Sequence, residues 1–417
     1  MTQHATARLL HPIRSSVTSN APLPYGAHLI EDDDIAAVVA AMRSDLLAQG
    51  PRVAAFEAAF AAKVGAKAAV ACSSGTAALH LALALHDVGP GDVCVVPAIT
   101  FLATATAARF LGADVVFADV DADTGLMTAD TLADAIGRAP GPVKIAAPVH
   151  LGGRLCDMPA LAKVAAREGS IVIEDACHAL GSIDPAGSDT GACGHAAAAT
   201  FSFHPVKTIA AGEGGMVTLN DAEGAERLKR LRNHGVTRDV ELLTEADSFS
   251  GPGEANPWSY EQIELGFNYR MNEMEAALGL SQLGKLDRFV EARRRLAARY
   301  DRLLEPLAPL VRPTPTPPGQ RPSPHLYSVL IDFAAAGMSR AALMRALAKA
   351  GVGTQVHYIP LYRQPYFRAR YGDIRRPGAE AYYARVLALP LFPAMTEADV
   401  DRVVTTFVSV LLGRERL

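Results

Sequence analysis

The fold is decided by residues 68–86, which read AAVACSSGTAALHLALALH. Ala68–Cys72 is an apolar run of strand length, the small residues after it favour a turn, and Gly75–His86 has the composition of a helix. Short β-branched runs and Ala/Leu-rich stretches continue to alternate from about residue 66 to residue 220. Apolar strands with helices between them predict an α/β domain with a mostly parallel sheet that is buried on both faces.

Outward from this unit, the pattern predicts the remaining elements of the domain. The further strands are Val93–Pro97, Val115–Val120, Ile145–His150, Ile171–Asp175, Ala198–Phe203 and Met216–Leu219. The helices between them are Ala103–Leu111, Thr131–Arg138 and Pro159–Glu168. We find no internal repeat.

The character of the chain changes after Asp221. We expect a charged helix, a loop and a long helix, then a proline-rich linker and a second α/β unit with a capped terminal helix. The charged helix is Ala222–His234, the loop is 240–257 and the long helix is Asn272–Leu304. The linker is PTPTPPGQRPSP, which starts at Pro313. The second α/β unit consists of the strand Leu326–Phe333, the helix Ser339–Ala350, the strand Gly353–Tyr358 and the helix that begins after Thr396. The domain prediction is a leader at 1–24, a large domain at 25–290 and a smaller C-terminal α/β domain at 291–417.

Composition excludes several classes of protein. The 417 residues are 50% apolar and have a formal net charge of -4, which disfavours both disorder and nucleic acid as a partner. The longest stretch without charge, residues 68–86, is interrupted by a polar turn, and the N-terminus has no apolar signal region, so we expect no membrane span and no secretion. Five cysteines without a C-x-x-C pair favour reduced thiols in the cytoplasm and no metal site.

The familiar cofactor signatures are missing from the sequence. We find no G-x-G-x-x-G after a strand, no G-x-x-x-x-G-K-[ST], no H-E-x-x-H and no G-x-S-x-G. Nicotinamide oxidoreductases, P-loop enzymes, zincins and serine hydrolases are therefore disfavoured.

Three other segments carry polar groups in a suggestive order. The turn with Ser74 and Thr76 leads into a helix, where free N–H groups suit a phosphate, although a simple capped helix would look the same. Asp175 ends a buried strand, at the sheet edge where α/β proteins bind ligands, and His178 follows three residues later. The alternative for Asp175 is a helix cap, and the alternative for His178 is a packed histidine without a catalytic role. Lys207 follows an apolar strand and precedes a glycine-rich turn. It is either an ordinary surface lysine or a desolvated amine that can form a Schiff base.

Together these segments predict a site for pyridoxal 5'-phosphate. That cofactor needs a lysine for its aldehyde, a carboxylate for its pyridine nitrogen and an anion cradle for its phosphate. The chain supplies the cradle, Asp175 and Lys207 in that order.

From Pro24 to the C-terminus the chain also resembles the DegT/DnrJ/EryC1/StrS sugar aminotransferases, which have the aspartate aminotransferase-like fold type I. The motifs that carry the resemblance are Ala48-Gln-Gly-Pro, Ser73-Ser-Gly-Thr-Ala-Ala-Leu-His-Leu-Ala, Pro148-Val-His-Leu-Gly-Gly, Glu174-Asp-Ala-Cys-His-Ala-Leu-Gly-Ser, Phe201-Ser-Phe-His-Pro-Val-Lys, Gly212-Glu-Gly-Gly and Leu265-Gly-Phe-Asn-Tyr-Arg-Met-Asn. Two positions depart from the usual pattern. Many members have Asp at the position of His195, and many have Ala or Ser at the position of Cys177.

The resemblance implies a role for each matching residue. Lys207 would hold the cofactor covalently and move the proton, with Asp175 at the pyridine nitrogen and His178 beside the ring. Phe101 would stack on the other face of the ring, where a core phenylalanine is the alternative. The phosphate would be bound by Ser74, Gly75, Thr76 and Ser202. Asn268 would reach the phosphate in a neighbouring subunit, which implies a homodimer, and His357 and Tyr358 are candidates for the sugar nucleotide or else half-buried strand residues.

The implied reaction is a ping-pong transamination from glutamate to a nucleotide-linked 4-keto sugar. Phe203-His-Pro-Val-Lys, the stretch from Ala276 to Asp287 and Gln355-Val-His-Tyr-Ile-Pro-Leu-Tyr most resemble enzymes acting on UDP-4-keto-6-deoxy-N-acetylaltrosamine in pseudaminic acid synthesis. GDP-perosamine, UDP-bacillosamine and UDP-4-amino-arabinose branches share much of this pattern. Dehydratases of the family usually have His in place of the lysine, which Lys207 disfavours, and a non-enzymatic cofactor-binding regulator remains an alternative.

Overall fold

The computed structural model describes residues 21–413. Most of the predicted leader, residues 1–24, lies outside the described residues. Its last part belongs to the fold, because Leu23 is buried and exchanges backbone hydrogen bonds with Gly351 and Gly353. No helix in the described part of the chain is both long and apolar enough to cross a bilayer.

The large sheet has seven strands in the order β1-β7-β6-β5-β4-β2-β3. All neighbours are parallel except β7, which runs antiparallel to β1 and β6. The predicted mostly parallel α/β fold is therefore confirmed. The strands are β1 Ala68–Cys72, β2 Val93–Pro97, β3 Asp114–Ala118, β4 Val143–Ala146, β5 Ile171–Asp175, β6 Ala198–Ser202 and β7 Gly215–Leu219.

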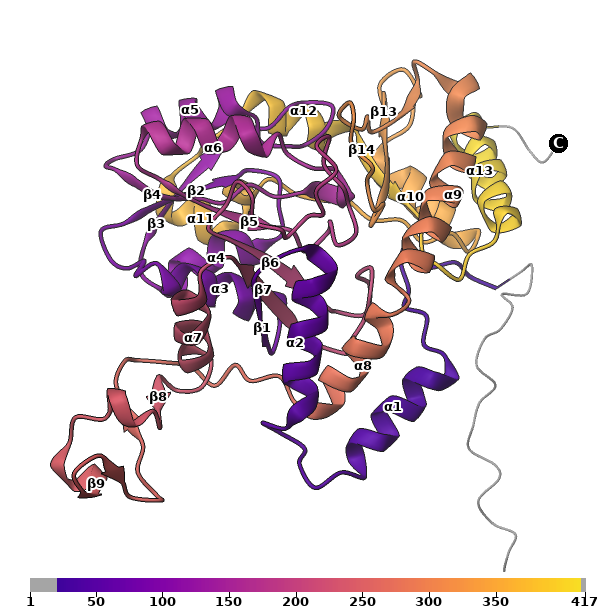
Figure 1. Cartoon of the computed structure of the whole chain (residues 1–417). Coiled ribbons are helices and arrows are strands. Elements are labelled where there is room, and N and C mark those ends of the chain that lie inside the picture. The colour runs from indigo at the N-terminus through magenta and orange to yellow at the C-terminus, as the bar shows by residue number, and fades with distance from the viewer. Residues whose placement is uncertain (1–20, 414–417) are drawn as a thin grey trace, which may run out of the picture.

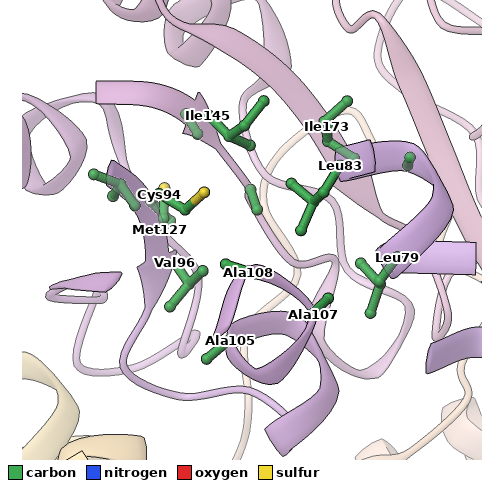
Figure 2. Close-up of a cluster of buried hydrophobic side chains, with 14 of the residues drawn as sticks. Leu79, Leu83, Cys94, Val96, Ala105, Ala107, Ala108, Met127, Ile145 and Ile173 are labelled. Carbon is green, nitrogen blue, oxygen red and sulfur yellow. The ribbon is translucent and has the colours of Figure 1, made fainter. Parts of the chain in front are cut away.

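Helices cover both faces of this sheet (Figure 1). They are α2 Pro51–Val64, α3 Gly75–Leu85, α4 Leu102–Phe110, α5 Ala129–Gly137, α6 Met158–Arg167, α7 Ala222–Leu231 and α8 Glu273–Leu283; α1 Asp32–Met42 packs on α8. Alternate residues of β1 serve opposite faces, since Val70 packs with α3 and α4 while Ala69 packs with α2. Figure 2 shows Leu83 of α3 beside Ile173 of β5 in the first of these clusters, to which Leu79 also belongs.

The small unit has its own core between a three-stranded antiparallel sheet and three helices. Its strands are β12 Val311–Pro313, β13 Tyr327–Ile331 and β14 Val386–Leu389. Its helices are α9 Leu286–Leu304, α10 Arg340–Lys349 and α13 Glu397–Leu411. The predicted cap of the terminal helix is present, because the Thr396 side chain accepts from the Asp399 N–H and the Asp399 carboxylate accepts in return.

Two predicted elements of this half are wrong. The long helix 272–304 is broken at Gly284, where Lys285 turns its ammonium toward the carboxylates of Asp33 and Asp34. The predicted strand Gly353–Tyr358 is an irregular segment, in which Gly353 donates to the Leu23 carbonyl and Gln355 pairs with Ala388. The third strand of the small sheet is β14, which the sequence pattern did not single out and which Gln355 meets at Ala388.

The proline-rich segment is ordered and joins the two units. Gln320 donates to the Leu155 carbonyl at 2.8 Å and accepts from its N–H at 2.9 Å, and Arg321 pairs with Ile183 through both backbone groups. Farther on, α11 Pro365–Tyr371 and α12 Pro377–Arg385 return to the large sheet. Phe367 and Tyr382 from these helices are buried in the core of that sheet.

A long arm leaves the body between α7 and α8 (Figure 1). It holds the short strands β8 Val236–Thr237, β9 Phe249–Gly251, β10 Glu254–Ala255 and β11 Glu261–Gln262. Trp258 and Leu265 on or beside it are exposed.

We expect Gly153→Ala to destabilise the fold by about 3 kcal/mol or more. Gly153 has a φ of 94°, and a Cβ there would lie 1.9 Å from the Ser323 carbonyl oxygen. Gly187→Ala is the matched control, because its φ of 89° is similar but nothing lies within 4 Å, so it should cost only about 1 kcal/mol. Urea unfolding followed by circular dichroism measures both, and equal losses would show that the contact with Ser323 is unimportant.

Candidate active site

A cavity of about 760 Å³ lies at the carboxyl ends of β1, β5 and β6. Segment 355–364, which precedes α11, forms its other wall. The structure brings ten of the predicted site residues to this cavity: Ser74, Gly75, Thr76, Phe101, Asp175, His178, Ser202, Lys207, His357 and Tyr358. Asn268 does not line it; this residue is exposed and pairs through its backbone with Asn233. Phe101 is 54% exposed, which removes the core alternative for it.

The start of α3 forms a close-packed anion cradle. The Ser74 side chain caps the helix by accepting from the Ala77 N–H at 3.1 Å, and the N–H groups of the first turn have no partner within a helix. Glycine is required at two points, since a Cβ on Gly75 would lie 2.6 Å from the Ser202 Cβ and one on Gly215 would lie 2.2 Å from the Ser74 carbonyl oxygen. The turn and the end of β6 can therefore hold a phosphate between them.

Asp175 is buried at the end of β5 and is held by neutral donors. Thr104 donates its hydroxyl to one carboxylate oxygen at 2.7 Å, and the Cys177 N–H donates to the other at 3.2 Å. Thr100 lies 2.8 Å from the Thr104 hydroxyl and completes a chain of three polar groups. Within residues 21–413, Asp175 has no ion pair, so a buried carboxylate faces the cavity with room for a protonated ligand atom.

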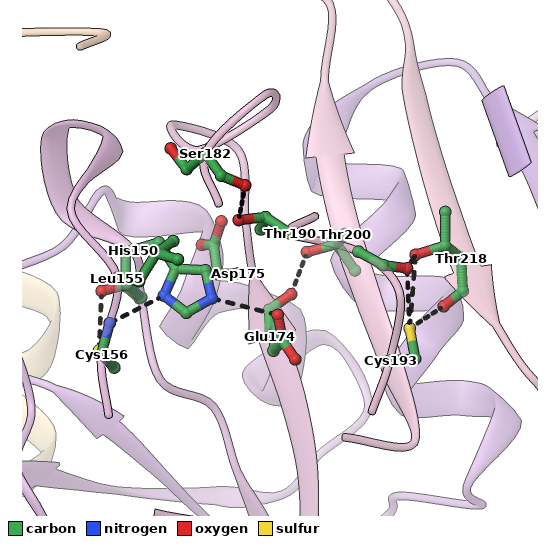
Figure 3. A network of polar contacts seen from close by, with 12 residues as sticks. His150, Leu155, Cys156, Glu174, Asp175, Ser182, Thr190, Cys193, Thr200 and Thr218 are labelled. Carbon is green, nitrogen blue, oxygen red and sulfur yellow. Dashed lines mark hydrogen bonds and ion pairs between the residues drawn. The ribbon is translucent and has the colours of Figure 1, made fainter. Parts of the chain in front are cut away.

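The neighbouring residue Glu174 belongs to a polar network behind the strand (Figure 3). His150 accepts the Cys156 N–H on Nδ1 at 3.2 Å, so its Nε2 carries the proton that it donates to Glu174 at 3.1 Å. Thr200 on β6 donates to the Glu174 carbonyl at 3.1 Å. The network fixes the end of β5 and with it the direction of the Asp175 side chain.

Lys207 lies in a tight turn between β6 and β7. Its N–H donates to the His204 carbonyl at 2.8 Å, and Ala211 donates to the Phe203 carbonyl at 2.9 Å, which closes the turn. Burial lowers the pKa of Lys207, although Cys177 and Asp175 nearby oppose this shift. A larger share of the amine is therefore neutral and nucleophilic near neutral pH than for an exposed lysine.

His178 and Tyr358 form the polar wall of the cavity. The Gly152 N–H donates to His178 Nδ1 at 3.3 Å, so the proton of the neutral ring sits on Nε2, 3.3 Å from the Tyr358 hydroxyl oxygen. Burial and the positive charge of Lys207 keep the pKa of His178 well below its usual value. Burial and Lys207 likewise lower the pKa of His357 to about 3, and burial raises the pKa of Tyr358. All three side chains are neutral near pH 7, and the tyrosine hydroxyl stays a donor.

The stability of the cofactor-free protein should rise with pH through the range in which Lys207 titrates. Between the lowered folded-state pKa and the ordinary value of 10.5, the unfolded chain binds a proton that the folded chain has lost. Unfolding then takes up a proton, so the free energy of unfolding increases with pH over this window. Urea titrations at several pH values should show this slope in the wild type and a shallower one in Lys207→Met. Parallel slopes would contradict the shifted pKa.

These residues fit pyridoxal phosphate. The cavity supplies a partly desolvated amine, a buried carboxylate without an ion pair and a helix start packed too closely for a side chain at Gly75. Each matches one part of the cofactor: the aldehyde, the ring nitrogen and the phosphate.

Sequence reasoning missed several residues of the site. Thr104 in the first turn of α4 and Thr100 just before that helix are four residues apart, and two hydroxyls so placed at a helix start could have indicated them. Gly152 belongs to the quoted motif Pro148-Val-His-Leu-Gly-Gly but had no role there, and Tyr25 carried no signal, because only the tertiary fold brings them to His178 and to the cavity wall.

Together, the fold and the site define a pyridoxal-phosphate-dependent aminotransferase of fold type I. The chain belongs to the DegT/DnrJ/EryC1/StrS aminotransferase family, whose model matches residues 28–408. It is therefore a sugar aminotransferase with pyridoxal phosphate as its cofactor.

Three relatives illustrate this membership. The spore coat polysaccharide biosynthesis protein SpsC of Bacillus subtilis is 37% identical over 396 residues, covering 94% of this chain and 98% of that protein. Helicobacter pylori PseC, an aminotransferase involved in the biosynthesis of pseudoaminic acid, has a TM-score of 0.84 at 27% identity and covers 94% and 100% of the two chains. Spr1654 of Streptococcus pneumoniae, solved in a PLP form, has a TM-score of 0.83 at 28% identity over 94% and 98%.

Proposed function

We propose that the enzyme transfers the amino group of glutamate to C4 of a UDP-linked 4-keto-6-deoxy sugar, giving a UDP-4-amino-4,6-dideoxy-N-acetylaltrosamine type of product. The observation that carries this proposal is the placement of His357 and Tyr358, from the Gln355-Val-His-Tyr-Ile-Pro segment, in the same cavity as Lys207. The similarity to PseC supports the same substrate class. Because the chain is also similar to SpsC, the GDP-perosamine, UDP-bacillosamine and UDP-4-amino-arabinose branches are the alternatives that the experiment below must distinguish.

The residues divide the chemistry between them. When bound, pyridoxal phosphate supplies an electron sink for the bond-breaking step. Asp175 would accept a hydrogen bond from the ring nitrogen and keep it protonated, while the cradle of Ser74, Gly75, Thr76 and Ser202 would hold the phosphate. Lys207 would hold the aldehyde of the cofactor, and its amine, when neutral, would move a proton at the substrate carbon.

The opposite wall orients the sugar. The His178 Nε2–H donates to the Tyr358 hydroxyl, which leaves the hydroxyl proton of Tyr358 free to donate into the cavity. Phe101 lies beside Tyr358, with ring centroids 6.1 Å apart and the rings tilted by 54°. A ring-shaped ligand can therefore be covered by Phe101 and hydrogen-bonded by Tyr358.

The test is amine transfer from glutamate to UDP-, GDP- and dTDP-linked keto sugars, followed by mass spectrometry. We expect the UDP-4-keto-6-deoxy-N-acetylaltrosamine substrate to have the highest kcat/KM, by about 100-fold or more over the GDP- and dTDP-linked sugars. A preference for a GDP-linked or arabinose-type sugar would replace the proposed substrate. Absence of transfer to every sugar, with cofactor bound, would favour the regulator.

Tyr358→Phe should raise KM for the sugar about 3- to 10-fold, as expected when one neutral hydrogen bond is lost. The half-reaction with glutamate should be unchanged, because the hydroxyl is assigned to the sugar. Tyr366→Phe is the matched control, since Tyr366 is exposed and lies outside the cavity. Stopped-flow spectra of each half-reaction separate the two effects, and an equal loss in both would remove the sugar-binding role.

We further propose a homodimer in which Asn268 completes the cofactor site of the partner. The exposed apolar side chains of Phe110, Trp258 and Leu265 support an interface of this kind. Mixing inactive Lys207→Ala with inactive Asn268→Ala subunits should restore up to about a quarter of the activity, because half of the chains form mixed dimers and each of those has one intact site. No recovery after subunit exchange would contradict shared sites.

The division of labour follows the predicted domains. We propose that the large domain, residues 25–290, holds the cofactor, while the small domain, residues 291–417, contributes His357 and Tyr358. The five cysteines are free thiols in the structure, which supports the proposal that the enzyme works in the reducing cytoplasm.

A further inference from the structure

A second polar cavity lies behind the wall that carries His178. It has a volume of about 430 Å³ and shares no lining residue with the cofactor cavity. Gly152 and Arg154 border it from the large domain, and α9, β12 and β13 border it from the small domain. Because the Gly152 N–H donates to His178, one short segment separates the two cavities.

Arg154 on this cavity is a buried cation without a counterion. Its side chain is 6% exposed, and within residues 21–413 it has neither an ion pair nor a hydrogen bond. An arginine stays charged at neutral pH, and a buried charge without a partner costs several kcal/mol. Arg293, which is also buried, leaves its Nε and Nη2 without partners too, but its Nη1 donates to the carbonyls of His325 and Leu391 at 3.3 and 3.0 Å and it does not line this cavity.

The unpartnered atoms of Arg154 are Nε and Nη2, which lie along one edge of the guanidinium. That edge presents two parallel N–H groups, the arrangement that binds a carboxylate or phosphate through both oxygens. Two hydroxyls on the same cavity, those of Thr314 and Ser328, also have no partner among the residues that the structure describes; the two residues are 7% and 3% exposed. A cluster of unmet donors of this kind calls for an acceptor.

The other charged groups on the cavity do not supply that acceptor. Arg294 adds a second positive charge, and its guanidinium donates hydrogen bonds to the carbonyls of Pro322, Gly181 and Arg321. Asp301 is the single acid among the lining residues; it accepts the Tyr327 hydroxyl at 2.7 Å, and burial raises its pKa. The cavity therefore has an excess of positive charge.

We propose that this cavity binds a small oxyanion, with the Nε/Nη2 edge of Arg154 as the main donor and the hydroxyls of Thr314 and Ser328 as further donors. The ligand is a phosphate- or carboxylate-bearing metabolite, since both groups match the guanidinium edge and the volume suits a small molecule. Because the donors come from both domains, the ligand joins them. The site does not depend on which sugar the enzyme aminates.

The test is calorimetric titration of the cofactor-loaded enzyme with inorganic phosphate and, separately, with succinate, at constant ionic strength. Loading the cofactor first keeps the phosphate cradle at Ser74 occupied. We expect one site per chain, and the probe with the higher affinity identifies the anionic group. No saturation by either probe at about 10 mM, an affinity of roughly -2.7 kcal/mol, would overturn the proposal.

Variants locate the site. Arg154→Met should weaken binding at least 10-fold, and Thr314→Val or Ser328→Ala about 3-fold or more, as for charged and neutral hydrogen bonds. Arg312→Met removes an exposed arginine of β12 that does not line the cavity, so the affinity of this variant for phosphate and succinate should equal that of the wild type.

Two results would overturn the proposal at this stage. Unchanged binding in Arg154→Met would do so, and so would a loss in that variant with no effect of either hydroxyl substitution. If Arg154→Met fails to fold, the two hydroxyl variants decide, because each removes one neutral oxygen.

Discussion

Lys207→Ala should abolish the covalent link to the cofactor and lower amine transfer by about 10⁴-fold or more. The loss is large because this amine both binds the aldehyde and moves the proton, and because the cavity holds no second lysine among its lining residues. Borohydride reduction of the wild type should trap the cofactor on the peptide that contains Lys207, while the variant should give no labelled peptide.

Lys144→Ala is the control for this experiment. Lys144 is half-buried, as Lys207 is, but it does not line the cavity and forms an ion pair with Asp92 at 2.9 Å. The Lys144→Ala variant should therefore be labelled and should react like the wild type. Labelling of a different lysine in the wild type would sink the assignment of Lys207. A merely misfolded variant is recognised by a changed circular dichroism spectrum.

Asp175→Asn should lower amine transfer by about 10³-fold while leaving the covalent link to Lys207 intact. An amide cannot balance the positive charge of a protonated ring nitrogen, so the ring loses its power to draw electrons. Borohydride trapping should still label Lys207, and the absorption band of the bound cofactor should shift. Separate trapping and turnover measurements therefore distinguish this variant from Lys207→Ala.

Thr104→Val tests whether the carboxylate must also be held in place. It removes the 2.7 Å hydrogen bond to Asp175 and keeps the charge, so a loss of about 10-fold is expected. Activity of Asp175→Asn within threefold of the wild type would exclude the charge-balancing role. A loss in Thr104→Val as large as that in Asp175→Asn would mean that position matters more than charge.

Much of the large domain could be predicted from local pattern. Its strands are largely buried and mostly apolar, so the sequence predicts β1, β2 and β5 with their observed ends. The small domain was harder, because its segment 353–358 has a strand-like composition but turns His357 into the cavity, away from the sheet. That change of direction depends on contacts with distant residues; for example, a Cβ on Gly353 would lie 2.9 Å from the Leu23 carbonyl.

The sequence predicts those site residues that lie within short motifs of reactive or phosphate-binding side chains. Ser74, Asp175 and Lys207 follow buried strands, so the topology alone brings them to one edge of the sheet. The partners that tune them come from elsewhere in the chain: Thr104 from α4 for Asp175, and Tyr358 from the small domain for His178. Arg154 stood next to a recognised motif, but only its burial without a counterion distinguishes it from a surface arginine.

The return of α11 and α12 to the large sheet has a practical consequence. A protease that cut the backbone near residue 290 would not release two separate lobes, because Phe367 and Tyr382 remain embedded beneath the first one. The nicked halves should co-elute until denaturant is added. Expressing residues 291–417 alone would leave those aromatic rings in water, and we expect the fragment to collect in inclusion bodies.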